Sequence, residues 1–244
     1  MAEANFTVDD VDFDAFYQGQ PPIKGAQVSF ELAPWDIGAP QPVVVALADS
    51  GEVRDDVLDA GCGLGNNAIF LAQRGFRVTG VDGAQPALER ARQRAADHGV
   101  EVEFVRADVT TLDGLTARYA TVLDSALYHC LNDEQRHAYA AALHRVTVPG
   151  ARLHLYCFAD TGNEGLGLPM NVTQDDLRAH LAAHWDIDAI DEVDYTTSLT
   201  LDAFRGEGAE RMRAAGLMVD PSGLRTDDRG RILCRAWQVR AGRT

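Results

Sequence analysis

Three glycines, Gly61, Gly63 and Gly65, alternate with other residues between a short apolar run and a stretch typical of a helix. Glycine lets a backbone turn tightly and approach a ligand closely, and a helix that begins behind such a loop offers free amides and a positive dipole end. Dinucleotide-binding folds use the pattern GxGxxG, whereas here Asn66 takes the place of the third dinucleotide glycine. The loop therefore favours a ligand without a phosphate at this point and disfavours a nicotinamide-dependent oxidoreductase, although a purely structural turn is an alternative.

Two carboxylates follow, each at the end of one of the next two apolar runs. Asp82 comes 21 residues after Gly61, where a carboxylate at a sheet edge can accept two hydrogen bonds from a ribose diol. Asp108 can accept a bond from an adenine amino group, and the backbone amide of Val109 can reach the ring. A solvated turn or a helix cap is the alternative role for Asp108. Together, the two carboxylates and the glycine loop predict a ligand that contains a nucleoside.

These residues need a scaffold of alternating strands and helices. Strands are predicted over residues 57–60, 77–81, 102–106, 119–124, 152–158, 185–194 and 231–239. Helices are predicted over residues 43–50, 66–74, 85–97, 133–146 and 173–183, and in part over 201–215, with Asp133 and Thr173 as N-caps. Nearly continuous apolar strands separated by helices indicate a parallel sheet covered on both faces. We therefore expect an α/β, doubly wound, mostly parallel sheet of seven strands.

Residues 54–158 resemble the class I S-adenosylmethionine-dependent methyltransferases in the order and spacing of the glycine loop, Asp82, Asp108 and the segment 122–125. The segment 34–42, with its prolines around Trp35, looks like the N-terminal part of the thiopurine, thiol and halide methyltransferase branch. The segments 124–129, 149–150 and 157–160 are similar to actinobacterial enzymes of that branch that methylate heterocycles, quinones or thiols. Residues 195–228 depart from these relatives.

The resemblance implies a single domain over 1–244, with an N-terminal lid at 1–42, a cofactor-binding core at 54–158 and acceptor-side segments at 160–228. It also implies the cofactor contacts, which are Gly61, Cys62 and Gly63 for the methionyl part, Asp82 and Gly83 for the ribose, Asp108 and Val109 for adenine, the backbone of Asp124 and Ser125 for the methionyl amino group, and Trp35 and Ile37 as the closing lid. An aromatic face such as that of Trp35 can attract a sulfonium, and plain core packing is its alternative role.

The acceptor pocket is expected beside these contacts, at the carboxyl edge of the sheet. It would include Phe13, Phe16, Tyr17, Tyr128 and His129, with the loop 160–171 and part of 195–228. Tyr128 and His129 are the candidate catalytic residues, and His129 suits a general base because free imidazole titrates near neutral pH. Its alternative role is a structural residue next to the pocket.

A metal is not expected. His180 and His184 lie four residues apart with Asp176 one turn earlier, a spacing that can ligate a metal, but no glutamate completes an HExxH pattern.

Charge and composition limit the classes of molecule that this protein is expected to bind. The formal net charge of −15 disfavours nucleic acids and anionic membranes. The four cysteines form no CxxC pair, and no signal peptide or long apolar run is present, so a soluble, cytoplasmic monomer or homodimer with reduced thiols is expected. The predicted function is S-adenosylmethionine-dependent methylation of S, O or N of a small molecule. The alternative is a protein that binds this cofactor without methylating, as a sensor or a cyclase-type enzyme.

Overall fold

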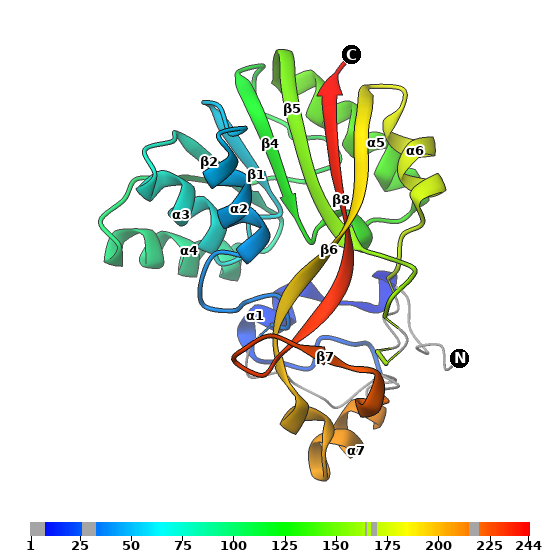
Figure 1. The fold of residues 1–244 in the computed structure, drawn as a ribbon. Helices are drawn as coiled ribbons and strands as arrows, with labels where there is room; N and C mark the ends of the chain where they lie inside the picture. The colour runs from blue at the N-terminus through cyan, green and yellow to red at the C-terminus, as the bar shows by residue number, and fades with distance from the viewer. Residues whose placement is uncertain (1–7, 26–32, 164, 167–169, 215–219) are drawn as a thin grey trace.

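The computed structural model describes residues 8–25, 33–163, 165–166, 170–214 and 220–244. One twisted sheet runs through it (Figure 1), in the order β3-β2-β1-β4-β5-β8-β6, with β7 beside β8. The strands are β1 Val57–Ala60, β2 Val78–Asp82, β3 Glu103–Arg106, β4 Tyr119–Ser125, β5 Thr147–Phe158, β6 Trp185–Thr200, β7 Arg225–Thr226 and β8 Arg231–Arg243. The first five are mutually parallel, and β8 is antiparallel to β5, β6 and β7.

Helices cover both faces of this sheet. They are α1 Phe13–Gln18, α2 Pro42–Ser50, α3 Asn66–Gln73, α4 Gln85–Asp97, α5 Asp133–Val146, α6 Gln174–Leu181 and α7 Glu207–Ala214, with the short 3₁₀ turns η1 Val8–Asp10, η2 Tyr128–Cys130, η3 Leu201–Phe204 and η4 Pro221–Gly223. The α/β, mostly parallel architecture is confirmed. Among the described residues no helix is both long and apolar enough to cross a membrane.

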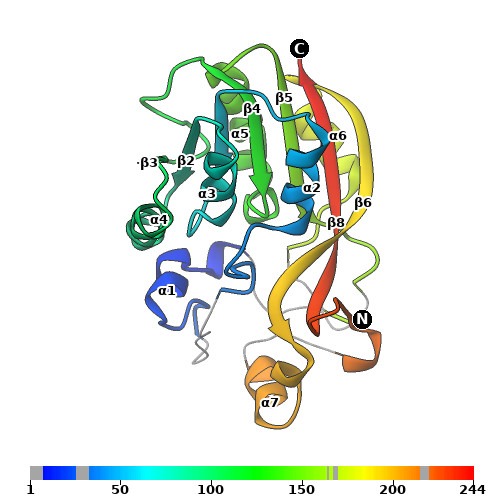
Figure 2. The ribbon, with the colours of Figure 1, turned by 60° about the vertical axis from the view of Figure 1, so that its left-hand side comes forward.

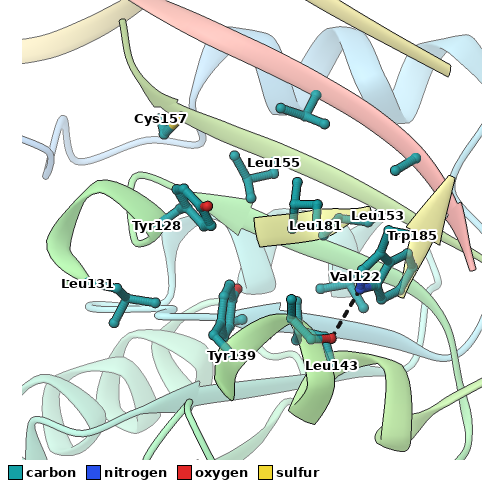
Figure 3. Packing of buried hydrophobic residues seen from close by; sticks show 14 of the residues in the cluster. Val122, Tyr128, Leu131, Tyr139, Leu143, Leu153, Leu155, Cys157, Leu181 and Trp185 are labelled. Atoms are coloured by element: carbon teal, nitrogen blue, oxygen red, sulfur yellow. Dashed lines mark hydrogen bonds between the residues drawn. The ribbon is translucent and has the colours of Figure 1, made fainter. Parts of the chain in front are cut away.

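Two apolar layers hold the helices to the sheet. Side chains of α5 and α6 pack on one face with Tyr128, Tyr139 and Trp185, and the Trp185 indole donates a hydrogen bond to the Ala140 carbonyl at 3.2 Å (Figure 3). Side chains of α2, α3 and α4 pack on the other face. Burying apolar area on both sides of the sheet is the main source of stability here, at roughly 25 cal/mol per Å².

Several local predictions need correction. Among the described residues, the predicted seven strands form the main path of the sheet, and the short β7 adds an eighth beside β8. Strand β6 continues to Thr200, beyond the predicted end at 194. Helix α5 is capped by Asn132 instead of Asp133, because Asn132 and Gln135 form a reciprocal capping box. Thr173 caps α6 as predicted.

The extra length of β6 and β8 shapes the side of the molecule where the parallel strands end. Both strands run past β5, and the turns around α7 lie at their tip (Figures 1 and 2). Helix α1 lies at the same edge of the sheet, near α4. The carboxyl edge is therefore flanked by the start of the chain on one side and by the β6–β8 extension on the other.

Candidate functional site

The glycine loop joins β1 to α3 and adopts a conformation that requires glycine. Gly61, Gly63 and Gly65 have φ values of +70°, +51° and +79°. A Cβ on Gly61 would lie 2.8 Å from the Leu127 Cβ, and one on Gly63 would lie 2.9 Å from the Tyr17 hydroxyl oxygen. Because these glycines have no side chains, the loop can pack this closely against Leu127 and Tyr17 and still leave space at its surface.

Asp82, at the end of β2, holds this loop in place. One carboxylate oxygen accepts a 2.8 Å hydrogen bond from the Gly63 amide, and the other accepts one of 2.8 Å from the Ala84 amide. Burial raises the pKa of Asp82, and these amide bonds oppose the rise. Each oxygen keeps a further lone pair for a ligand. Sequence reasoning predicted the ligand contact and missed the loop-holding role.

A cavity of about 890 Å³ opens at the carboxyl edge beside this loop. Nine of the predicted site residues line it, namely Phe13, Tyr17, Trp35, Gly61, Asp82, Gly83, Asp108, Val109 and Ser125. A smaller pocket on the other side of Trp35 and Gly61 is lined by Cys62 and Gly63 among others. Phe16, Ile37, Asp124, Tyr128 and His129 line neither cavity.

Aromatic side chains from α1 surround Trp35 at one wall. The Trp35 ring lies 5.0 Å from the Phe16 ring, edge to face, and 6.1 Å from the Phe13 ring, measured between centroids. The Trp35 indole donates a 3.1 Å hydrogen bond to the Tyr17 hydroxyl. Phe16 thus packs against Trp35 without lining the cavity, whereas Phe13 and Tyr17 line it.

Asp36, which sequence reasoning missed, anchors this wall. It is buried, and its carboxylate bonds to Arg94 of α4 at 3.1 Å and to the Asn66 amide at 2.6 Å. Burial alone would raise the pKa of Asp36, but the bonds from Arg94 and Asn66 hold it below its ordinary value. No spacing in the sequence connects residues 36 and 94, so only the fold reveals the pair.

The strand β6 holds the same segment from the other side. The Gln41 side-chain amide donates a 3.0 Å hydrogen bond to the Thr196 carbonyl, and the Ser198 amide donates one of 2.8 Å to the Pro34 carbonyl. Residues 33–42 are thus fixed between α4 and the β6 extension. These bonds place Trp35 over the glycine loop.

Two buried carboxyl groups lie under the loop. Asp59, at 1% exposure, accepts no side-chain hydrogen bond from the described residues, and the backbone amide of Ala68 in α3 is the group that faces its carboxyl. Asp124 accepts bonds from the Leu127 amide and the Tyr139 hydroxyl, both at 2.9 Å. Burial raises the pKa of Asp59 to about 8, with added repulsion from Asp124 and Asp82, and burial raises the pKa of Asp124 to about 7. A cation bound above these carboxyl groups would lower their pKa values again, so their charged forms and a cationic ligand would stabilise each other.

His129 does not occupy the position expected of a general base. It is buried and stacks on the Phe158 ring at 4.2 Å, and its Nδ1 accepts a 3.3 Å hydrogen bond from the Phe158 amide. Burial, aided by Arg136, lowers the pKa of His129 to about 3. In the neutral ring the other nitrogen then carries the proton, so no lone pair is free to accept one. The structure supports the alternative, a structural residue behind the cavity wall.

Tyr128 is likewise a core residue. Its ring packs 6.5 Å from the Tyr139 ring, and the Arg136 guanidinium lies 5.1 Å from its centre (Figure 3). Burial raises the pKa of Tyr128 far above its ordinary range. The predicted catalytic role of Tyr128 is therefore not supported by its position.

A His129→Gln variant tests this correction. The amide oxygen of glutamine can still accept the bond from the Phe158 amide, so we expect kcat to stay within about threefold of wild type. The pH profile of kcat between pH 5 and 8 should not change, because a group with a pKa of about 3 does not titrate there. Steady-state kinetics across this range are the measurement. A fall of roughly a hundredfold, the usual loss for a general base, would restore the catalytic role.

Comparisons with known proteins agree with this arrangement. A model of the methyltransferase domain family matches residues 57–150. A 2-heptyl-1-hydroxyquinolin-4(1H)-one methyltransferase of Mycobacteroides abscessus is 31% identical over 233 residues, which make up 95% of this chain and 96% of that protein.

Solved structures show the same likeness. A structure from work on the conversion of a disulfide bond into a thioacetal group during echinomycin biosynthesis has a TM-score of 0.73 and 34% identity, and the match covers 95% of this chain and 91% of that one. A Burkholderia thailandensis 1,6-didemethyltoxoflavin-N1-methyltransferase, with bound 1,6-didemethyltoxoflavin and S-adenosylhomocysteine, has a TM-score of 0.57 and 23% identity over 83% of this chain and 77% of that one. At that identity the likeness concerns the fold.

Proposed function

The chain belongs to the S-adenosylmethionine-dependent methyltransferases, and from this premise we propose that it methylates a flat, apolar small molecule whose acceptor atom is already nucleophilic near neutral pH. The supporting observation is the cavity of about 890 Å³, which combines a nucleoside-binding edge with an aromatic wall and contains no histidine or lysine among its described lining residues.

The residues of this edge fit the cofactor. The glycine loop leaves space that side chains would fill, and a cation above it would stabilise the charged form of the buried Asp59 carboxyl. We propose that Asp82 binds the ribose, Asp108 and Val109 bind adenine, and the loop with the backbone of Ser125 holds the methionyl part. When bound, S-adenosylmethionine supplies an activated methyl group on a sulfonium. The protein's contribution is then to align the acceptor and exclude water, and alignment alone can contribute roughly 7–11 kcal/mol.

Apart from four aspartates, Asp12, Asp14, Asp82 and Asp108, the described lining of the cavity offers no side chain suited to take a proton from a weakly acidic acceptor. Burial, with a smaller contribution from Asp82, raises the pKa of Tyr17 well above its ordinary value. Burial, with Asp124 and Asp82 adding to it, raises the pKa of Cys130 to about 12. Both groups therefore stay protonated and cannot act as bases. An acceptor that ionises by itself, such as an aromatic thiol or an N-hydroxy heterocycle, needs no such help.

The relatives point to the same class of acceptor. The similar protein of Mycobacteroides abscessus is a methyltransferase for a 1-hydroxyquinolin-4-one. The aromatic wall of Phe13, Tyr17 and Trp35, whose rings are tilted to one another, suits an aromatic ring of this size. The absence of nucleic-acid partners and the monomeric or dimeric state remain predictions from charge and composition.

A panel of acceptors tests the proposal through formation of S-adenosylhomocysteine. It pairs 1-hydroxyquinolin-4-ones and aromatic thiols with ring-matched compounds that carry an aliphatic alcohol. We expect methylation of the acidic members alone, with a rate that rises through the acceptor's own pKa. Methylation of the alcohols at a comparable rate would contradict the proposed acceptor class. Tight cofactor binding without any product would instead favour the alternative of a sensor or cyclase-type protein.

A further inference from the structure

A group of possible metal ligands lies between α5 and α6, outside the cavity. Asp133 and His137 are one turn apart on α5 and share a face of that helix, and His180 comes from α6. One ligand atom from each of these residues lies within 4.8 Å of the others. His184, which the sequence pairs with His180, instead lies beside His144, with ring centres 5.3 Å apart.

The surroundings of His180 are unusual for a neutral histidine. Its side chain is 6% exposed, and its Nδ1 lies 2.6 Å from a carboxylate oxygen of Asp176. Its Nε2 lies 2.9 Å from a carboxylate oxygen of Asp133. A neutral imidazole carries one N–H, so it can satisfy only one of these acceptors. With the N–H on Nδ1, Nε2 and the Asp133 carboxylate oxygen turn lone pairs toward each other, an arrangement that a bound cation satisfies.

The half-buried carboxylate of Asp176 prepares His180 for a metal. Asp176 is fixed by an ion pair with Arg136 of α5, and both side chains are largely shielded from solvent. Beside this carboxylate, the main-chain carbonyl of Asp176 lies 2.8 Å from His180 Nδ1 and accepts its proton, which fixes the tautomer in which Nε2 points its lone pair outward. This is the arrangement found behind many metal-bound histidines, where the outer carboxylate also makes the ring a better ligand.

The remaining two ligands can adjust to an ion. Asp133 and His137 are exposed, so their side chains can rotate without disturbing the core. Zinc bonds to nitrogen and oxygen are about 2.0–2.2 Å long, which places tetrahedral ligands roughly 3.3–3.5 Å apart. Opening the 2.9 Å distance between His180 Nε2 and Asp133 by this small amount requires movement of Asp133 alone.

We propose that Asp133, His137 and His180 bind Zn²⁺, with a fourth position open to solvent. Two imidazole nitrogens and one carboxylate suit zinc, whereas magnesium and calcium prefer oxygen ligands. The ion lies between His180 and Asp133 and ties α6 to the first turns of α5. Leu131 and Gln135, on either side of Asp133 in the sequence, line the acceptor cavity, so the ion would also brace that wall.

Zinc binding to the full-length, tag-free protein tests this proposal. Competition with a chromophoric chelator measures the affinity for Zn²⁺, and the visible absorption of added Co²⁺ reports tetrahedral coordination. We expect His137→Ala and Asp133→Asn to weaken Zn²⁺ binding by at least about tenfold, the lower end of the loss seen when even an outer partner of a metal site is removed. Zn²⁺ should raise the melting temperature of wild type more than that of either variant.

Two matched variants serve as controls. Glu134→Gln removes a neighbouring carboxylate from the same first turn of α5, and His98→Gln removes an exposed histidine at the end of α4. Both should bind Zn²⁺ like wild type. Equal binding by all four variants, or a wild-type protein that gives no tetrahedral Co²⁺ spectrum, would overturn the proposal.

Discussion

An Asp82→Ala variant is expected to bind S-adenosylhomocysteine at least about a hundredfold more weakly than wild type. In wild type the Asp82 carboxylate would accept two hydrogen bonds from the ribose hydroxyls. Each hydrogen bond to a charged group is worth roughly 1.5–3 kcal/mol. Asp82 also accepts the amide protons of Gly63 and Ala84, so its loss loosens the loop as well. Isothermal titration calorimetry with S-adenosylhomocysteine is the measurement.

Two further variants separate these effects. Asp82→Asn keeps one side-chain acceptor and should lose less affinity than the alanine variant. Asp97→Ala, at the exposed end of α4, removes a carboxylate elsewhere and should bind the ligand like wild type. Unchanged affinity in Asp82→Ala, with the thermal unfolding curve showing a folded protein, would remove Asp82 from the cofactor site.

A Gly61→Ala variant is expected to lose both stability and cofactor affinity. Alanine at a φ of +70° costs roughly 1–2 kcal/mol. Its Cβ would lie 2.8 Å from the Leu127 Cβ, and such overpacking costs roughly 1–3 kcal/mol more. We expect the free energy of unfolding to fall by about 2–5 kcal/mol and the Kd for S-adenosylhomocysteine to rise more than tenfold. Denaturant unfolding and calorimetry measure the two quantities.

The matched control for this variant is Gly51→Ala. Gly51 has a similar φ of +77° at the end of α2, but a Cβ there would meet no atom within 4 Å. The free energy of unfolding of Gly51→Ala should therefore fall only by the cost of the positive φ, and its affinity for the cofactor should not change. Equal losses of stability in both variants would show that the close approach of Leu127 to the loop does not matter.

The grouping of the residues proposed to bind the cofactor was predictable because it depends on local pattern. The apolar strands and the helices between them determine a parallel sheet, and parallel strands bring their carboxyl ends to one edge. Gly61, Asp82 and Asp108 each follow such a strand, so their positions along the sequence place them together. Confirmation that all three line one cavity needed the structure.

The acceptor side was not predictable in the same way. After β4 the chain turns through Ala126, a non-glycine residue with a φ of +75°, whose amide donates to the Tyr156 carbonyl. This turn sends Tyr128 and His129 into the core instead of the cavity. The pair of Asp36 and Arg94 is also invisible in the sequence, because 58 residues separate partners that only the tertiary fold brings together.

The hydrogen bonds that hold residues 33–42 against β6 also set an order of events during synthesis. Gln41 leaves the ribosome 155 residues before its partner Thr196. At roughly 5–20 residues per second, this delay is about 8–30 s. The β1–β5 sheet can form in that interval, while Trp35 and its aromatic neighbours still lack the strand that fixes them. The acceptor wall is therefore completed late in synthesis, and since β6 joins the described part of the sheet only through β8, its supporting strand is not held in place until Arg231–Arg243 has followed.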